Sequence, residues 1–339
     1  MDITLCIPTR NRPGFILRAL RYYQSMNFHG TISIGDSSDE AIAGQVRNSL
    51  SQFAKSFDIN YHYMPDCNAA TALQILIDKA KTAYAAAVGD DDFIVPSGMA
   101  KCVDFLNLHP EYVAAHGIGV IVGAYLGGSK SLEYASYYPQ PIITEPTAAQ
   151  RLNSYLANYT VSVFSVHRIE AWRVMFENAK SIADTSFGSE LLQCCLSVIL
   201  GKVKEVEGLY LIRQDHGKRN LLPNWFEWIT NENWHSSYTK FRDYLAQVVV
   251  RQDGITFMEA KRVVENAFAS YLVQCIPGNT PTSQWRILAR RIPGARKIWR
   301  TMEPLRNKYC LSNLLNSSSA YYNDFMPVYK AITNLPEKN

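Results

Sequence analysis

The sequence of 339 residues is long enough for one large domain or two medium ones, and 47% of it is hydrophobic, as in a globular protein with a full core. Its formal net charge of +4 is too small for a protein that coats nucleic acid, so no nucleic-acid partner is expected. We find no leader of basic and then apolar residues, no apolar run of about 18 residues, and no CxxC spacing among the seven cysteines. These features predict a cytoplasmic protein with reduced, buried thiols.

Strand and helix patterns alternate along the first part of the chain. Short apolar runs are typical of buried strands, and the segments between them carry apolar stripes at helical spacing. This order predicts an α/β fold with a parallel sheet wound by right-handed crossovers. The predicted strands lie at 4–8, 31–34, 59–64 and 85–88, and the predicted helices at 13–23, 42–57 and 69–84.

The later part of the chain continues the mixed pattern and then becomes helical. A change to Trp-rich and then helical sequence places a domain boundary near residue 220. We therefore expect a catalytic α/β domain over 1–220 and a mainly helical C-terminal extension over 221–339. The further predicted strands lie between 112 and 138 and at 162–167, 202–206 and 209–214, and the further helices at 145–158, 168–179, 189–200, 238–250 and 257–274.

Polar clusters follow three of the predicted strands, at 8–12, 35–39 and 89–92. Ligands of wound sheets bind beyond the carboxyl ends of the strands. The winding rule places all three clusters on one rim of the sheet, so they are expected to form one site.

The cluster at 89–92 contains three consecutive aspartates, Asp90, Asp91 and Asp92, which we call the acidic triplet. Adjacent carboxylates repel one another unless a cation compensates them. Their oxygens suit Mg²⁺ or Mn²⁺, held through Asp90 and Asp92 with Asp91 close by, and a diphosphate and waters would complete the shell. The alternative is a solvated acidic turn.

The other two clusters suit a nucleotide. Asp36 and Ser37 end a strand, where a carboxylate accepts hydrogen bonds from a ribose hydroxyl or a base, or else caps a turn. Thr9, Arg10 and Arg12 supply donors near a helix N-terminus, a place that suits phosphate, although surface arginines are also common. No GxGxxG or Walker-type glycine pattern occurs, which disfavours a dinucleotide oxidoreductase or a P-loop NTPase.

These motifs resemble those of family-2-type glycosyltransferases with the GT-A fold. Residues 4–12, TLCIPTRNR, look like the opening strand of that family, and 34–39, IGDSSD, like its nucleoside-binding strand end. Residues 89–92, GDDD, resemble the metal-binding Asp-x-Asp motif. Further on, 187–192, 201–203 and 208–213 are similar to its acidic helix, glycine, strand and tyrosine-arginine succession.

The resemblance implies metal-dependent transfer of a sugar from a nucleotide-sugar, with a UDP-sugar favoured, to a saccharide or lipid-linked hydroxyl acceptor, with inversion. It implies that Glu190 is the catalytic base, with Asp184 as the alternative because this chain has Ser-Glu where the family usually has Glu-Asp. His216 matches a metal or diphosphate ligand. The donor would contact Pro8, Thr9, Arg10, Arg12, Asp36, Ser37 and Asp91. The pathway expected is surface polysaccharide or glycolipid assembly.

Two rival functions stay open at this stage. One is an inactive GT-A-like binding or scaffold protein, which the imperfect Ser189-Glu190 pair allows. The other is a nucleotidyltransferase, which would normally need a Gly-rich basic loop after the first strand. Only the arginines of such a loop are present.

Two aromatic features of the C-terminal part also have two interpretations each. Basic residues and tryptophans interleave over 285–300, a pattern that suits docking to an anionic membrane at its inner face or, alternatively, a helix pair packed on the domain. Trp225, Trp228 and Trp234 either stack on acceptor sugars or are buried at the junction.

Overall fold

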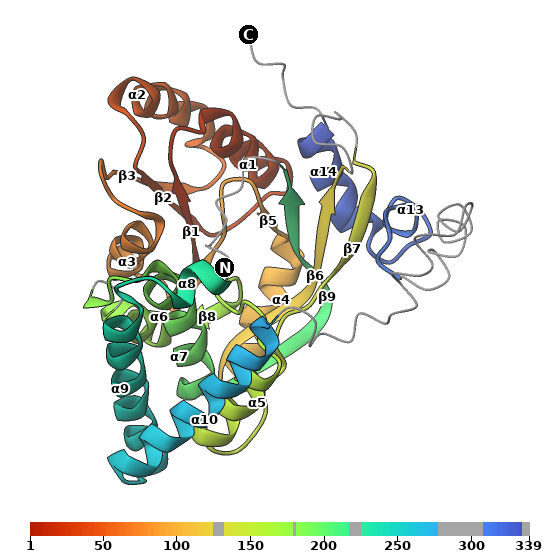
Figure 1. Cartoon of the computed structure of the whole chain (residues 1–339). Helices are drawn as coiled ribbons and strands as arrows, with labels where there is room; N and C mark the ends of the chain where they lie inside the picture. The colour runs from red at the N-terminus through yellow and green to blue at the C-terminus, as the bar shows by residue number, and fades with distance from the viewer. Residues whose placement is uncertain (125–131, 179–180, 217–224, 277–307, 334–339) are drawn as a thin grey trace, which may run out of the picture.

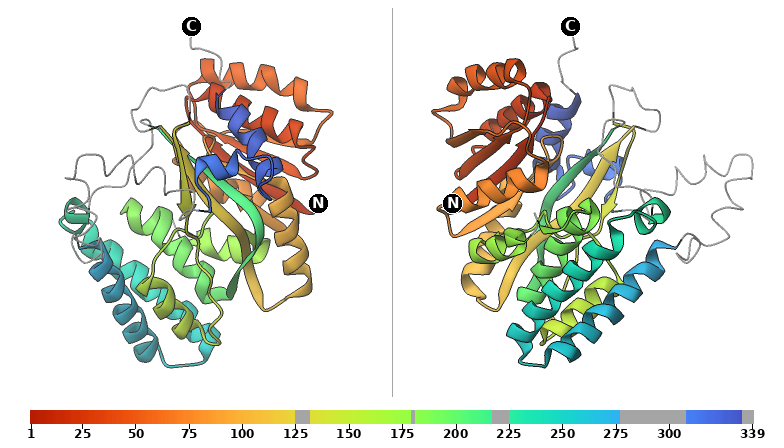
Figure 2. Two further views of the ribbon diagram at one scale, coloured as in Figure 1. Left: turned by 90° about the vertical axis from the view of Figure 1, so that its right-hand side faces the viewer. Right: turned by 60° about the vertical axis from the view of Figure 1, so that its left-hand side comes forward.

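The computed structural model describes residues 1–124, 132–178, 181–216, 225–276 and 308–333. A central sheet of nine strands has helices on both faces, and a group of long helices lies below it (Figures 1 and 2). The predicted α/β class with a largely helical C-terminal part is thereby confirmed. None of the described helices is both long and apolar enough to cross a membrane. The basic segment 285–300 lies outside the described residues.

The first four strands are parallel, as predicted. The pairing order is β3-β2-β1-β4, and a helix or turn covers each crossover. The strands are β1 (Ile3–Thr9), β2 (Thr31–Asp36), β3 (Asp58–Tyr63) and β4 (Tyr84–Ala87), and the connecting elements are α1 (Pro13–Ser25), α2 (Glu40–Ser49), the 3₁₀ turn η1 (Leu50–Phe53) and α3 (Ala69–Lys79).

The remaining strands make the sheet mixed rather than parallel throughout. β8 pairs antiparallel with both β4 and β6, β9 is parallel to β6, and β5 and β7 are antiparallel additions. The parallel arrangement predicted from the first part of the chain is thus found in β1–β4 and again between β6 and β9, whereas no strand direction was predicted for the later strands. These strands are β5 (Phe93–Ile94), β6 (Tyr112–Gly123), β7 (Tyr134–Tyr138), β8 (Val166–Arg168) and β9 (Lys202–Asp215).

Alternate residues of the inner strands face two different cores. On β1, Leu5 and Ile7 pack in the core shared with α1, whereas Cys6 packs with Leu76 of α3 in the other core. On β4 the small side chains allow the close approach of helices, so Ala85 also reaches the second core. This double burial explains why both strands read as continuous apolar runs in the sequence.

Three element boundaries differ from the sequence prediction. The helix expected over 42–57 stops at Ser49 and tightens into η1. The helix expected over 69–84 stops at Lys79, because Tyr84 is the first residue of β4. The two strands expected at 202–206 and 209–214 are one strand, β9, which is irregular near Gly208, where φ is +114°.

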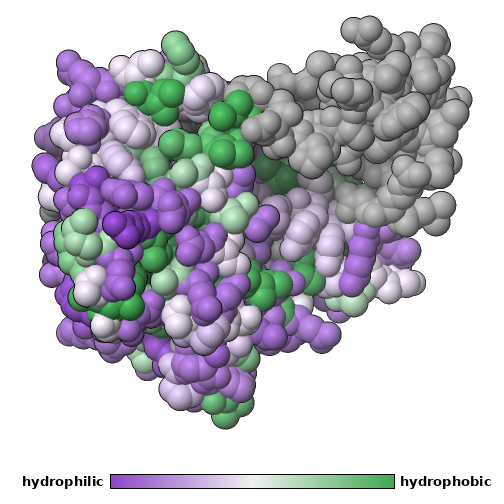
Figure 3. Space-filling model, turned by 60° about the horizontal axis from the view of Figure 1, so that its bottom comes forward, coloured by the Kyte–Doolittle hydropathy of each residue, from purple (hydrophilic) through white to green (hydrophobic). Residues whose placement is uncertain are grey.

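The helices of the second half pack beneath and beside the sheet. α9 and α10 share the core of α5, α6 and α7, and α14 packs on α1 in the other core, so residues on both sides of position 220 contribute to each core. On the face in Figure 3, hydrophobic residues lie in small groups among polar ones. The elements are α4 (Pro96–Leu108), α5 (Ala148–Ala157), α6 (Ile169–Glu177), the π-helical turn η3 (Phe187–Leu191), α7 (Leu192–Leu200), α8 (Trp225–Ile229), α9 (Trp234–Asp253), α10 (Phe257–Cys275), α13 (Leu311–Leu314) and α14 (Tyr322–Thr333).

Candidate active site

The carboxyl ends of β1, β2 and β4 meet on one rim of the sheet, as the winding rule predicted. Thr9 lies beside Asp36 in the β1–β2 register, and β4 runs parallel to β1 on its other side. Three hydrogen bonds join the following loops: the Asn11 N–H donates to Ser38 Oγ (2.7 Å), the Asp39 N–H donates to Asn11 Oδ1 (2.9 Å), and Asn11 Nδ2 donates to Asp39 Oδ2 (3.3 Å). Asn11 has a positive φ of 54°, a conformation that Asn tolerates better than most residues.

Asp90 and Asp91 of the acidic triplet share one cation, Arg12. Its Nη1 lies 2.8 Å from Asp90 Oδ1 and 2.9 Å from Asp91 Oδ2. Thr9 Oγ1 donates to the second oxygen of Asp90 over 2.7 Å. The residues after β1 and β4 are therefore joined by their side chains, and Arg12 provides the compensating charge that adjacent carboxylates require.

Asp92 turns to a different group of partners. It is 3% exposed, and its oxygens accept from Arg213 Nε (3.0 Å) and from the Gln214 N–H (2.9 Å), both at the end of β9. The structure therefore does not bring Asp90 and Asp92 together as a pair of ligands. The carboxylate that meets His216 is instead Asp91, whose Oδ2 lies 2.7 Å from His216 Nε2.

Arg18 of α1 is a buried arginine behind the acidic triplet. Its Nη2 donates to the backbone oxygen of Asp91 (3.0 Å) and its Nη1 to Gln214 Oε1 (2.7 Å). The guanidinium lies 4.8 Å from the ring centre of Phe15 and 4.9 Å from that of Phe93. Burial lowers the pKa of Arg18 to about 10. It thus remains charged near neutral pH and fixes the loop that carries the triplet.

The three carboxylates differ in their titration. Burial raises the pKa values of Asp90 and Asp92 above the ordinary range. Burial also acts to raise the pKa of Asp91, but the hydrogen bond with His216 and the charge of Arg12 outweigh it and lower this pKa to about 2. Asp91 is therefore the carboxylate of the triplet that stays ionised to the lowest pH.

The donor pair that would hold the expected divalent cation at this rim is Asp91 with His216. Within the described ranges, no group of three or more His, Cys, Asp and Glu side chains is arranged to hold a metal. A carboxylate oxygen beside an imidazole nitrogen is nonetheless a donor pair that suits Mn²⁺, and such sites commonly keep waters and substrate phosphates as further ligands. The metal set predicted from the sequence, with Asp90, Asp92 and His216, is thus not assembled here, because Asp92 is paired with Arg213.

The nucleoside residues predicted at the ends of β1 and β2 have unequal exposure. Asp36 is 0% exposed and accepts from the Ser38 N–H (2.9 Å) and the Tyr61 hydroxyl (2.8 Å), which is the turn-capping role given as its alternative. Ser37 is buried and its N–H donates to the backbone oxygen of Thr9 (2.9 Å). Pro8 is half-buried, and Arg10 is exposed.

Glu190 lies in a separate cavity of about 340 Å³ beside α8 and α10. Its Oε1 accepts from the Tyr159 hydroxyl over 2.9 Å. Burial raises the pKa of Glu190, while the Tyr159 hydrogen bond and the positive charge of Arg213 act against that rise. A half-buried carboxylate with a raised pKa has the properties of a general base. The walls of the cavity include Trp225, Trp228, Tyr271 and Cys275.

Asp184, the alternative base, is buried and its carboxylate is used in hydrogen bonds that stabilise the local structure. It is 8% exposed, and its Oδ1 accepts from the Phe187 N–H (3.0 Å) and from Trp228 Nε1 (3.0 Å). These bonds cap the start of η3 and fix Trp228 in the wall of the cavity. Trp228 is buried, as the junction interpretation predicted, and it also lines the cavity.

Arg213 binds Asp92 at the rim, and its charge also acts on Glu190. Besides Asp92 it binds the Tyr138 hydroxyl through Nη1 (2.9 Å), and its guanidinium lies 4.7 Å from the ring centre of Phe164. Its positive charge acts to lower the pKa of Glu190, against the larger effect of burial. The acidic triplet and the candidate base thus share one electrostatic neighbourhood.

No protein-family model and no curated protein matches the sequence. Among solved structures, the chain is similar to S. aureus TarS with 11% identity and a TM-score of 0.49, over 86% of this chain and 46% of that one. It is also similar to S. aureus TarS 1-349 in complex with UDP-GlcNAc (11%, TM-score 0.47, 88% and 78% covered). A third similar structure is the mannosyltransferase PcManGT from Pyrobaculum calidifontis in complex with GDP-Man and Mn²⁺ (13%, TM-score 0.42, 98% and 85% covered).

The chain spans less than half the length of the first of these proteins. All three similarities have TM-scores below 0.5 and identities below 25%, so they carry no argument about the donor, the acceptor or the metal of this chain. Function is therefore inferred from the residues of the site itself.

Several residues of the site were not singled out by the sequence. Arg18 lies in the middle of an amphipathic helix, where an arginine is ordinarily exposed. Tyr159 and Tyr61 belong to segments without a distinctive motif. Arg213 belongs to the segment 208–213 that carries part of the family resemblance, but it was given no role there. For Gln214, near the end of β9, the available signal was that a polar residue follows a long apolar run whose end faces the same rim.

Proposed function

We propose that this chain is a metal-dependent glycosyltransferase that moves a sugar from a nucleotide diphosphate sugar to a hydroxyl acceptor with inversion. The observation that carries the proposal is the joining of Thr9, Arg12, Asp91 and His216 at one rim, where Arg213 carries a charge that also acts on Glu190. The fold family proposed is GT-A, on the strength of the sequence resemblance. The acceptor would be a saccharide or a lipid-linked saccharide.

The rim supplies the donor half of the site. Arg12 and the exposed Arg10 follow β1, close to the N-terminus of α1, where a diphosphate is favoured by charge and by free N–H groups. The nucleoside would lie toward β2, with Asp36 supporting the loop from beneath and Ser37 beside it. A divalent cation at Asp91 and His216, when bound, would offset the charge that builds on the departing diphosphate.

The Glu190 cavity supplies the acceptor half. The acceptor hydroxyl would attack the anomeric carbon from the side opposite the diphosphate, so the bond to the diphosphate oxygen breaks as the new bond forms. Glu190 would take the hydroxyl proton, and Tyr159 holds the carboxylate in place. The indole of Trp225 in the cavity wall would stack on an acceptor ring.

Metal-assisted nucleotide binding is the direct test of the rim. UDP and GDP are expected to bind more tightly with Mn²⁺ than with a chelator, and Asp91→Asn should remove most of that difference. Changes even to groups that only support metal ligands lower metal affinity by about 10- to 100-fold. Calorimetric titration measures both constants, with Asp39→Asn, an exposed carboxylate on the same rim, as the matched control. Equal Mn²⁺ enhancement in both variants would remove Asp91 from the metal site.

The pH profile should report the Glu190 carboxyl. Because burial raises its pKa, the deprotonated base is lost as pH falls through a value above the ordinary range of glutamate, and kcat falls with it. Tyr159→Phe removes a hydrogen bond that lowers this pKa, so the acidic limb of the profile should move to higher pH. Tyr244→Phe, whose hydroxyl binds Glu177, is the control, and an identical acidic limb in all three proteins would exclude Glu190 as the titrating group.

A nucleotide-binding protein without transferase activity is the second candidate. It is favoured by one observation, that Arg12 and Arg213 already neutralise the acidic triplet. Slow hydrolysis of a nucleotide-sugar in the presence of Mn²⁺, abolished by a chelator, would support the transferase instead. Release of nucleoside diphosphate rather than pyrophosphate would distinguish it from a nucleotidyltransferase.

A further inference from the structure

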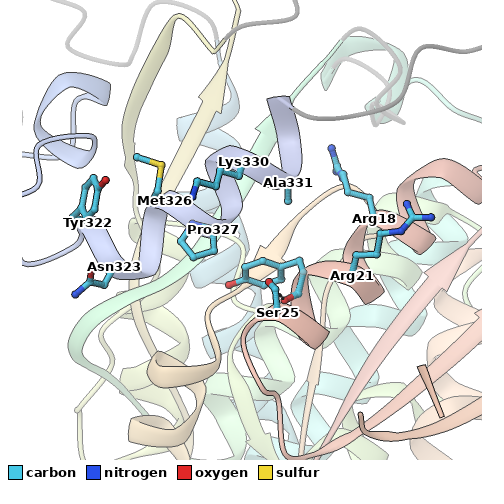
Figure 4. A pocket seen from close by; sticks show the side chains of 10 residues that line it. Arg18, Arg21, Ser25, Tyr322, Asn323, Met326, Pro327, Lys330 and Ala331 are labelled. Atoms are coloured by element: carbon cyan, nitrogen blue, oxygen red, sulfur yellow. Dashed lines mark hydrogen bonds between the residues drawn. The ribbon is translucent and has the colours of Figure 1, made fainter. Parts of the chain in front are cut away.

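A second cavity, of about 600 Å³, lies between α1 and α14, away from the Glu190 cavity. Figure 4 shows Pro327 and Lys330 of α14 on one side of it, and Arg21 and Ser25 of α1 on the other. Its volume is in the range of small-molecule sites in proteins. The proposed sugar transfer gives this cavity no role.

Two buried polar groups at this cavity lack partners. Tyr22 is 2% exposed and Arg18 is 4% exposed, and both line the cavity. The Tyr22 hydroxyl and Arg18 Nε have no hydrogen-bond partner among the described residues. Buried polar atoms are satisfied in the great majority of cases, and an unsatisfied one is costly. A ligand with acceptor oxygens at this place would supply both partners.

The charges around the cavity indicate that the ligand is negatively charged. Arg18, Arg21 and Lys330 line it, and none of the described lining residues is acidic. The carboxylate whose charge acts on Tyr22 is Asp324 of α14, which accepts from Ser97 Oγ over 2.8 Å and does not line the cavity. Three cations, two phenols and no carboxylate among the described lining residues favour a compact anion with several oxygens.

We propose that the cavity between α1 and α14 binds a phosphate-bearing ligand, with Arg18, Arg21 and Lys330 as its cationic contacts and Tyr22 as a hydrogen-bond donor. Arg18 uses its two terminal nitrogens on the loop of Asp91 and on Gln214, and its Nε is left without a partner among the described residues. The ligand would therefore lie beside the same side chain that supports the rim. The phosphate is carried either by a soluble sugar phosphate or by a lipid headgroup.

Binding to the purified full-length protein tests this site. The probes are inorganic phosphate, glucose 6-phosphate, and phosphatidylcholine vesicles with and without phosphatidylglycerol. The double variant Arg21→Glu/Lys330→Glu, which changes two exposed side chains, should weaken binding by about tenfold or more. The double variant Arg251→Glu/Arg262→Glu, which changes two exposed arginines on α9 and α10, is the charge-matched control and should bind as the wild type does.

Tyr22→Phe should change the thermal midpoint and the affinity for the phosphate probe in opposite directions. It removes an unsatisfied buried hydroxyl, so the thermal midpoint of the free protein should rise, while affinity for the phosphate probe should fall. Binding of the soluble probes alone assigns the site to a metabolite, and binding of the anionic vesicles alone assigns it to a headgroup.

Three outcomes would overturn the proposal: no binding of any probe, equal binding by the double variant and the wild type, or complete displacement of the probe by UDP with Mn²⁺. The last would place the phosphate on the rim and leave the proposed transferase activity untouched.

Discussion

Replacing Glu190 by glutamine is expected to lower kcat for sugar transfer by about 10²- to 10⁴-fold, the range that a positioned general base contributes. The amide keeps the size of the side chain and can still accept the Tyr159 hydroxyl bond, so the cavity should keep its shape. The dissociation constant of the nucleotide-sugar should hardly change, since the donor would contact the rim. Steady-state kinetics together with calorimetric titration of the donor separate the two quantities.

Asp184→Asn is the matched control for this experiment. The asparagine side chain would keep an oxygen that accepts from the Phe187 N–H and from Trp228 Nε1, so kcat and stability should stay close to those of the wild type. A large loss of kcat in Asp184→Asn with normal activity in Glu190→Gln would reverse the two assignments. Loss of donor binding in Glu190→Gln would contradict the division between donor and acceptor halves.

Replacing Arg213 by methionine is expected to lower the free energy of unfolding by about 3–5 kcal/mol, because it leaves the carboxylate of Asp92 buried without its counter-ion. Asp92 is 3% exposed, and burial already raises its pKa. Only the Gln214 N–H would remain as a strong partner. Urea unfolding followed by circular dichroism measures the change, provided that the transition is two-state.

The double variant Asp92→Asn/Arg213→Met tests the reason for that loss. Removing the buried charge together with its partner should restore much of the stability, as replacement of whole buried pairs often does. The coupling energy from the four proteins of the cycle should therefore be large. Independent effects that simply add would show that Arg213 stabilises the fold through its packing on Phe164 and Tyr138 instead.

The position of the site was predictable because it follows from topology. Parallel strands wound in one direction must bring their carboxyl ends to one rim, so the clusters after β1, β2 and β4 had to meet. The apolar runs of β1 and β4 were recognisable for the related reason that each strand is buried on both faces. The order of the strands and helices along the chain was therefore enough to predict where the site lies.

The direction of individual side chains was not predictable in the same way. The sequence prediction assigned the metal to Asp90 and Asp92, but the neighbours of the three aspartates come from positions 12, 213 and 216, which only the folded chain brings near. Arg18 was missed because its burial depends on the rings of Phe15 and Phe93 and on acceptors from distant loops. Long-range partners of this kind leave no local pattern.

The packing of α14 on α1 has a consequence for experiments that shorten the chain. Phe325, Val328 and Ile332 lie in the same core as Leu20 of α1, although α1 and α14 come from opposite ends of the sequence. A truncated protein that ends before α14 would expose this apolar surface and loosen the helix that carries Arg18. Deletion of the C-terminal helices should thus be read as a change to the catalytic rim itself, and low activity in such a fragment would say little about what the tail binds.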